Sequence, residues 1–217
     1  GLEDMDPKEV TIAQLLQKEG YRTGCFGKWH NGRTFATHPN QQGFDTFFGF
    51  RSGGIGNYFD PVLESNSQRV KTKGFVTDIL TDQAIQFIEK NKSRPFFCYI
   101  PYNAPHTPFQ VPNTYFDKYK KKDLPDDVAA LYGMIENIDD NVLKLLNTLK
   151  KNNLENNTIV IFLSDNGPIC CRYNAGLKGN KGSVNEGGVK VPFIIKWPGH
   201  LKKGEKIDHI AAHVDIL

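Results

Sequence analysis

The stretch TIVIFLSDNG, residues 158–167, decides the fold. Its first six residues form a mainly apolar run, which is typical of a strand buried on both faces of a parallel sheet. The last four residues are polar and turn-forming, so the strand would end in a loop that carries a carboxylate and a carboxamide. The segments 95–100 and 191–196 have the same apolar pattern. We therefore expect three strands of one sheet.

Helical patterns separate these strands. Apolar residues recur at steps of three and four between Val128 and Leu149, and a second helix is expected over residues 76–89. A short helix would begin with Asp6 as its cap and Pro7 in its first turn, and would end at Gly20 before a strand over 21–26. Residues 30–74 are rich in Gly, Asn, Ser and aromatics, which predicts a long irregular segment with short pieces of structure. Alternating strands and helices predict an α/β fold with a mostly parallel sheet.

The composition excludes several classes of protein. With 217 residues and 39% apolar content, the chain can bury one core, and a single domain is the default. A net charge of +3 does not indicate nucleic-acid binding, and the basic run at residues 118–122 is interpreted as a solvated loop. No stretch reaches the roughly 18 apolar residues of a membrane span. We expect Cys25 and Cys98 to be buried thiols, whereas Cys170 and Cys171 could form disulfides or line a loop.

Polar loops follow three of the predicted strands. The carboxyl ends of parallel strands meet at one edge of a sheet, so these loops should converge. Lys28 and His30 are two apart and would point to the same side of an extended segment, although such a pair is weak evidence alone. His106 lies between Pro105 and Pro108, which restrict its backbone. It could protonate a leaving group or merely cap a loop.

Two further segments supply candidates for metal and anion binding. Asp165 and Asn166 offer hard oxygen ligands suited to calcium or magnesium, but the same residues are common in plain turns. The segment 178–188 is basic and glycine-rich and contains Lys181. It lacks the Gly-Lys-Ser/Thr ending of a nucleotide-binding loop, so it is either another type of anion-binding loop or a flexible one.

Taken together, four stretches resemble the type I sulfatases of the alkaline phosphatase superfamily. They are GYRTGCFGKWH at 20–30, the run from Pro95 to Pro108, NTIVIFLSDNG at 157–167, and the run from Lys181 to Pro192. They lie in the order of the family and span nearly the whole chain. The resemblance implies a three-layer α/β/α sandwich of the alkaline phosphatase type, truncated at both ends.

The resemblance also implies residue roles. Asp165 and Asn166 would be two ligands of a calcium ion, with magnesium as the alternative. Lys28 and His30 would contact the nucleophile, and His30 would act as the base when sulfate is expelled. Lys181 would bind the sulfate oxygens, and His106 would bind sulfate and assist the leaving alcohol. Fixed cations and imidazoles suit the negative charge that develops on sulfate oxygens.

One part of the family pattern is missing from the sequence. The family nucleophile is a formylglycine made from a Cys/Ser-x-Pro-x-Arg motif, and an upstream Asp pair completes the metal site. None of the four cysteines has a proline two residues later, and Ser93-Arg94-Pro95 continues to Phe97 instead of arginine. We therefore expect residues 1–217 to be part of a catalytic domain, without its nucleophile segment and C-terminal subdomain, and without turnover of its own.

Other functions remain open at this point. A phosphatase, phosphodiesterase or phosphoglycerate mutase of the same superfamily is one alternative, and a non-catalytic module that holds sulfated glycans through Lys28, His106 and Lys181 is another. Expected partners are sulfated carbohydrates or small sulfate esters. Arg51, Asn57, Asn185 and the loop at residues 58–61 could recognise a sugar, although packing explains most of these aromatics. An extracytoplasmic location is expected from the resemblance alone.

Overall fold

The computed structural model describes residues 4–169 and 173–216. The chain falls into two compact units, one with residues up to Asn152 and from His213 onward, and the other with residues between Asn153 and Ala212. Each unit is treated by itself below. Among the described residues, no helix combines the length and the apolar character needed to cross a membrane.

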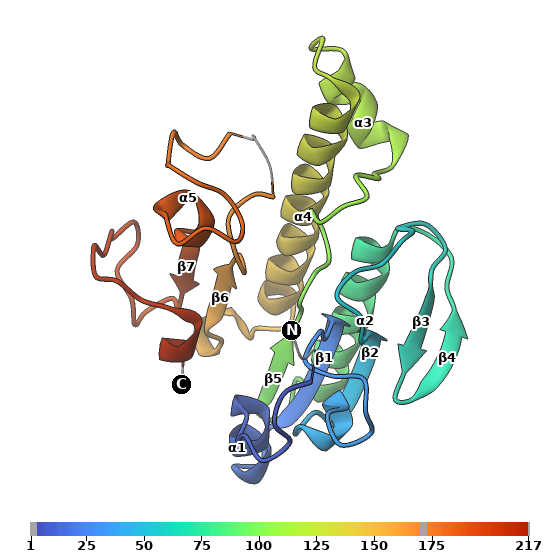
Figure 1. The fold of residues 1–217 in the computed structure, drawn as a ribbon. Coiled ribbons are helices and arrows are strands. Elements are labelled where there is room, and N and C mark those ends of the chain that lie inside the picture. The colour runs from blue at the N-terminus through green and yellow to red at the C-terminus, as the bar shows by residue number, and fades with distance from the viewer. Residues whose placement is uncertain (1–3, 170–172, 217) are drawn as a thin grey trace. The chain divides into compact units, whose positions relative to one another are not determined.

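A five-stranded sheet forms the centre of the first unit, in the order β4-β3-β2-β1-β5 (Figure 1). β1 (Arg22–Lys28) pairs in parallel with β2 (Thr46–Phe50) on one side and with β5 (Phe96–Tyr99) on the other. β3 (Val62–Ser65) and β4 (Gln68–Lys71) form an antiparallel extension at the β2 edge. The three parallel strands therefore end at one common edge.

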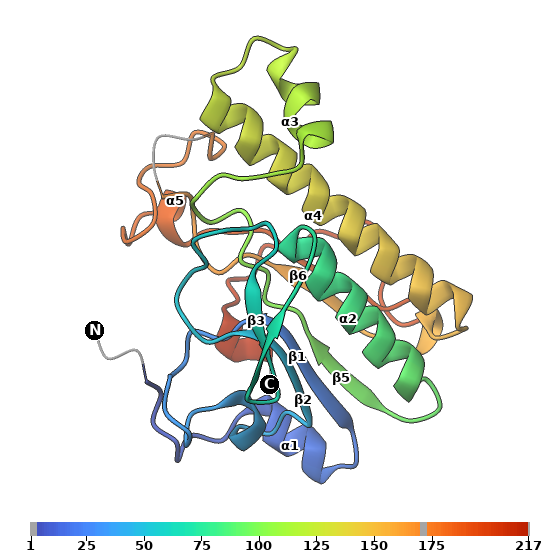
Figure 2. The same cartoon turned by 90° about the vertical axis from the view of Figure 1, so that its right-hand side faces the viewer.

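Helices cover both faces of this sheet. α2 (Val76–Asn91) packs on β1, β2 and β5, and α4 (Asp126–Lys151) runs alongside α2 (Figure 2). α3 (Asn113–Lys120) packs on α4, and α1 (Ile12–Lys18) packs on β1. The short 3₁₀ turns η1 (Pro39–Gln41) and η3 (His213–Ile216) complete the unit.

The side chains of β1 show why the sheet has two covered faces. Cys25 is fully buried in a cluster with Ala13, Trp29, Phe44 and Phe47. The next residue, Phe26, points to the other face because side chains alternate along a strand. Its ring lies 5.4 Å from the ring of Phe87 in α2. β1 is thus buried on both sides, which is the position of a central strand.

The second unit contains a two-stranded antiparallel sheet. The expectation that segments 95–100, 158–163 and 191–196 are strands of one sheet is therefore wrong, because β5 lies in the five-stranded sheet of the first unit. β6 (Val160–Leu163) pairs with β7 (Phe193–Lys196), with Val160 opposite Lys196. The unit also contains the turn η2 (Glu155–Asn157) and the short helix α5 (Glu186–Val189). The segment 164–167 follows β6 directly, as the sequence predicts.

Several local expectations are wrong. α1 begins at Ile12 with Thr11 in a capping box, because Thr11 and Gln14 satisfy each other's backbone N–H groups, and neither Asp6 nor Pro7 starts a helix. By contrast, the segment 30–74 contains the short strands β2, β3 and β4 within otherwise irregular chain, as expected. The basic run is exposed, as expected, but it is not all loop: Lys118 and Lys120 end α3 and form ion pairs with Glu136 and Asp126, and Lys121 and Lys122 lie in the turn that follows.

The structure describes two of the four cysteines, Cys25 and Cys98. Cys25 is buried, as predicted, and Cys98 is half-buried. Loss of water around each sulfur raises the pKa of both thiols, so both stay protonated near neutral pH and are poor nucleophiles. Cys170 and Cys171 lie outside the described residues.

Candidate functional site

Lys28 is the last residue of β1 and lies at the common edge of the parallel strands. Its backbone N–H donates to the carbonyl of Pro101 at 2.8 Å, which ties the end of β1 to the loop after β5. Gly27 permits this approach: its φ is +147°, and a Cβ there would collide with the carbonyl of Pro101. The half-buried Lys28 is therefore held next to the loop that carries His106.

His30 and His106 lie near consecutive glycines, Gly53 and Gly54, of one loop. His30 has a left-handed backbone, with φ of 51°, and its side chain lies against Gly53. A Cβ on Gly53 would come within 2.7 Å of Cε1 of His30, whereas a Cβ on Gly54 would sit 3.6 Å from Cε1 of His106. Consecutive Cα atoms are only about 3.8 Å apart, so both imidazoles lie against the same short piece of chain.

The buried side chain of Tyr58 is hydrogen-bonded to the loop that carries His106. The hydroxyl of Tyr58 donates to the carbonyl of His106 at 2.7 Å and accepts a short hydrogen bond from Nδ2 of Asn103. The N–H of His106 donates to the carbonyl of Asn103 at 2.9 Å. Tyr58 is fully buried, and burial raises the pKa of its phenol, which keeps it a hydrogen-bond donor. The peptide bonds before Pro105 and Pro108 are both cis.

The hydrogen bonds of His106 fix the roles of its ring nitrogens. Nδ1 lies 2.7 Å from the carbonyl oxygen of Thr107. Because a carbonyl oxygen can only accept, Nδ1 must carry a hydrogen. Nε2 is therefore the nitrogen that can gain or release a proton, which is the arrangement required for acid–base chemistry.

Replacement of Gly53 by alanine tests the placement of His30. The new methyl group would displace the ring, which is a movable side-chain end, so we expect the free energy of unfolding to change little. We expect the nuclear magnetic resonance signals of the His30 ring to shift relative to those of the parent chain. Gly56→Ala is the matched control and should leave these signals in place, because a Cβ at Gly56 meets nothing within 4 Å. Unchanged His30 signals in Gly53→Ala would contradict this placement.

In the second unit, backbone hydrogen bonds join the loop after β6 to the glycine-rich loop. The N–H of Gly167 donates to the carbonyl of Gly188 at 2.9 Å, and the N–H of Lys181 donates to the carbonyl of Pro168 at 2.8 Å. A Cβ on Gly167 would overlap the backbone of Gly187, so this contact requires glycine. The backbone of Lys181 is therefore hydrogen-bonded to Pro168, which follows Asp165 by three residues in sequence.

The oxygen atoms of Asp165 and Asn166 suit a hard cation. Nδ2 of Asn166 donates to the carbonyl of Gly167 at 3.0 Å, which leaves Oδ1 as the amide acceptor. Asp165 is exposed and has no hydrogen bond or ion pair to another described residue. Within residues 4–169 and 173–216, no three His, Cys, Asp or Glu side chains gather as a metal site. The donor types fit calcium or magnesium, but two ligands need additional oxygens.

The six predicted residues thus form two groups. The first unit holds Lys28, His30 and His106, which lie on or beside the loops containing Pro101 and Gly53-Gly54. The second unit holds Asp165, Asn166 and Lys181, whose two loops are linked by backbone hydrogen bonds. Convergence of the two groups stays a prediction. Sequence reasoning missed the supporting roles of Gly53, Asn103 and the Tyr58 hydroxyl. Of these residues, only Gly53 could have been noticed in the sequence. It belongs to a Gly-Gly pair, and such a pair often marks a place where other side chains approach the backbone closely.

Arg51 has a structural role that the sequence did not reveal. Its Nε donates to Glu64 at 3.0 Å and its Nη1 donates to the carbonyl of Arg33 at 2.7 Å. Glu64 also lies 2.6 Å from Nε2 of the buried His38, whose Nδ1 accepts the N–H of Asn40. This network fixes the loop that follows His30 to the hairpin of β3 and β4.

Comparison with known proteins gives a family match over almost the entire chain. The family model described as Sulfatase matches residues 3–217. The chain is 34% identical to the uncharacterised sulfatase YdeN of Escherichia coli (strain K12) over 226 residues, covering 90% of this chain and 40% of that protein. It is 30% identical to the N-acetylgalactosamine-6-sulfatase of Mus musculus, covering 96% and 44%. The chain spans less than half the length of these curated relatives.

Solved structures agree with this match. The crystal structure of Ps i-CgsB in complex with k-i-k-neocarrahexaose is similar with a TM-score of 0.86 and 37% identity, covering 92% of this chain and 50% of that one. The α/β architecture with its mostly parallel sheet is therefore of the alkaline phosphatase type. Fold, motif order and family model agree, and the chain belongs to the sulfatase family of sulfuric ester hydrolases.

Proposed function

We propose that the chain provides the sulfate-binding and leaving-group side of a formylglycine-dependent sulfatase that acts on sulfated carbohydrates. The observation that carries this proposal is that His30 and His106 both lie against the Gly53-Gly54 loop, while the end of β1 at Lys28 is hydrogen-bonded to Pro101. Two imidazoles and the Lys28 ammonium at one edge suit an anionic ester with a basic leaving group. The mouse relative is named for a sulfated sugar, and the similar crystal structure holds an oligosaccharide, which supports carbohydrate as the substrate class.

Each residue has a distinct task in this proposal. Lys28 stabilises negative charge at the nucleophile, and His30 takes its proton when sulfate is expelled. His106 gives the proton on Nε2 to the oxygen of the departing alcohol, while Nδ1 stays bonded to Thr107. Lys181 neutralises charge on the sulfate oxygens.

The proposal includes a metal ion and a longer polypeptide. Asp165 and Asn166 would supply two of its oxygen ligands, and a bound Ca²⁺ or Mg²⁺ would withdraw electron density from a sulfate oxygen. The formylglycine and the remaining ligands would come from outside the 217 residues, because no Cys/Ser-x-Pro-x-Arg motif occurs among them. Residues 1–217 would then be one part of an extracytoplasmic catalytic domain that cannot turn over substrate by itself.

Matched esters test the proposal. An enzyme form that carries the nucleophile segment should show a higher kcat/KM for 4-nitrophenyl sulfate than for 4-nitrophenyl phosphate, and the 217-residue chain should hydrolyse neither. Faster release of phosphate would favour a phosphatase. Tight binding of a sulfated oligosaccharide without release of sulfate from the longer form would favour a glycan-binding module.

A further inference from the structure

The backbone at His30 is held by hydrogen bonds on both sides. His30 has a left-handed φ of 51°, which a residue other than glycine rarely keeps unless its surroundings fix it. Directly before it, the N–H of Trp29 donates to the carbonyl of Phe50 at 2.9 Å. Three residues after it, the carbonyl of Arg33 accepts a hydrogen bond from Nη1 of Arg51 at 2.7 Å. The last residue of β2 and the residue that follows it therefore bracket the segment that contains His30.

The same arginine begins the loop against which the His30 ring lies. The ring packs on Gly53, which follows Arg51 by two residues. Asp4 also holds the chain after His30, because its carboxylate accepts the N–H of Arg33 at 2.7 Å. Arg51 differs from Asp4 in that it belongs to the loop that carries Gly53. It therefore fixes the chain after His30 relative to the surface under the ring.

Glu64 in turn fixes the side chain of Arg51. Oε2 of Glu64, in β3, accepts a hydrogen bond from Nε of Arg51 at 3.0 Å. Oε1 of Glu64 lies 2.6 Å from Nε2 of the buried His38, whose Nδ1 accepts the N–H of Asn40. Nδ1 therefore carries no hydrogen, and Nε2 is the donor to Glu64. Each carboxylate oxygen thus has its own donor, and the carboxylate cannot turn away from Arg51 without loss of both bonds.

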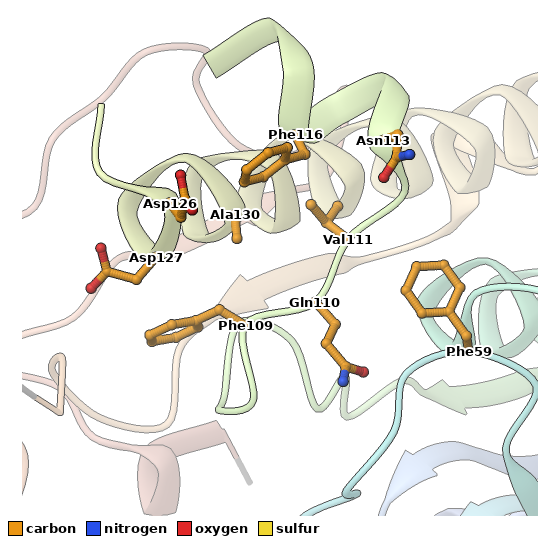
Figure 3. A pocket seen from close by; sticks show the side chains of 9 residues that line it. All are labelled: Phe59, Phe109, Gln110, Val111, Asn113, Phe116, Asp126, Asp127 and Ala130. Atoms are coloured by element: carbon orange, nitrogen blue, oxygen red, sulfur yellow. The ribbon is translucent and has the colours of Figure 1, made fainter. Parts of the chain in front are cut away.

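Direct contact of Arg51 with a bound sugar is the competing explanation. The first unit has a hollow of ≈ 490 Å³ with aromatic side chains in its wall, Phe59 and Phe116 among them (Figure 3), and neither Arg51 nor Glu64 lines it. Two of the three nitrogens of Arg51, Nε and Nη1, already donate within the protein, and 29% of the side chain is exposed. This arrangement favours support of the chain over contact with a ligand.

We propose that Arg51 and Glu64 are positioning residues that hold the His30 imidazole in the orientation in which it acts as a base. The inference rests on the proposed function and extends it to two residues that act through His30. Arg51 holds two acceptors in fixed directions, the carbonyl of Arg33 and the carboxylate of Glu64. A planar guanidinium suits this task, whereas the ammonium of lysine is a point charge on a flexible stem.

Nuclear magnetic resonance of the 217-residue chain tests the positioning. We expect a nuclear Overhauser contact between the ring protons of His30 and the α-protons of Gly53. Arg51→Met keeps a long side chain but removes its donors, so it should lose this contact, and Arg51→Lys should restore part of it. Arg94→Met is the matched control and should keep the contact, because Arg94 is exposed and lies two residues before β5, at the opposite end of the parallel strands.

Glu64→Gln keeps the test decisive if Arg51→Met does not fold. Gln has nearly the shape of Glu, but its NH₂ group would face one of the two donors, so the His30 contact with Gly53 should weaken. The contact at full strength in both Arg51→Met and Glu64→Gln would overturn the inference.

Kinetics separate this inference from the proposed function. In an enzyme form that carries the nucleophile segment, Arg51→Met should lower kcat for 4-nitrophenyl sulfate about tenfold and change KM less than about twofold, because a misplaced base slows a step after binding. A raised KM at unchanged kcat would mean that Arg51 binds substrate, and would overturn the inference. Loss of the contact between His30 and Gly53 at unchanged kcat would leave the positioning in place and contradict His30 as the base.

Discussion

Replacement of His106 by alanine is expected to lower kcat/KM for a sugar sulfate about 10³-fold in an enzyme form that carries the nucleophile segment, as for loss of a general acid. A sugar alkoxide is a poor leaving group and needs the proton from Nε2. Nitrophenolate leaves without one, so the same variant should lose only about tenfold on 4-nitrophenyl sulfate. Measurement of both esters with purified variants checks this difference.

Lys181→Ala provides the comparison. Lys181 is proposed to contact sulfate oxygens that are common to both esters, so its loss should reduce both rates by a similar factor of about 10² to 10³. If His106→Ala instead slows the two esters equally, His106 binds sulfate but does not protonate the leaving alcohol.

The largest effect on stability is expected for Gly49→Ala. Gly49 lies in β2 opposite Gly27, and a Cβ there would overlap the carbonyl group of Gly27 in β1. Backbone atoms in the middle of a paired sheet cannot move aside as a side chain can, so we expect the free energy of unfolding to fall by about 3 kcal/mol. Urea unfolding followed by circular dichroism measures the change.

Gly56→Ala is the matched control for this experiment. A Cβ at Gly56 has open space around it, so its effect should stay within about 1 kcal/mol. A Gly49→Ala midpoint equal to that of Gly56→Ala would mean that β1 and β2 do not approach each other as closely as described.

The elements that could be predicted are those with a strong period or a long apolar run. α4 follows the stripe of apolar residues from Val128 to Leu149, and β6 follows the run that ends at Ser164. Both patterns can be recognised within a single element, without knowledge of the partner. Burial follows them less closely, because Ile161 and Phe162 of β6 are 38% and 40% exposed.

The missed elements depend on distant partners. β2 has the sequence TFFGF, and a glycine such as its Gly49 usually weakens a strand. Gly49 is needed here because the carbonyl of Gly27 occupies the space that a side chain at position 49 would take. The pair Asp6-Pro7 is a good local start signal, so the sequence predicts a start of α1 that is too early. The observed cap is Thr11, which also donates its hydroxyl hydrogen to the carbonyl of Gln42. A hydrogen bond between residues far apart in sequence produces no periodic pattern of apolar residues.

The candidate site shows the same division. Motif order predicts which residues belong to the site. The structure bonds the end of β1 at Lys28 to Pro101 and places His30 and His106 against the Gly53-Gly54 loop. The support from Tyr58 could not be predicted, because its hydroxyl bonds to a backbone carbonyl 48 residues away in sequence.

A nuclear magnetic resonance titration of the 217-residue chain with sulfate, in the presence of calcium, tests the central claim most directly. If the two groups form one anion site, signals of His30 and His106 in the first unit and of Asn166 and Lys181 in the second should shift together, with one dissociation constant. Lys181→Ala should then abolish the shifts at His106. Shifts confined to one unit, or two unrelated dissociation constants, would contradict a single shared anion site.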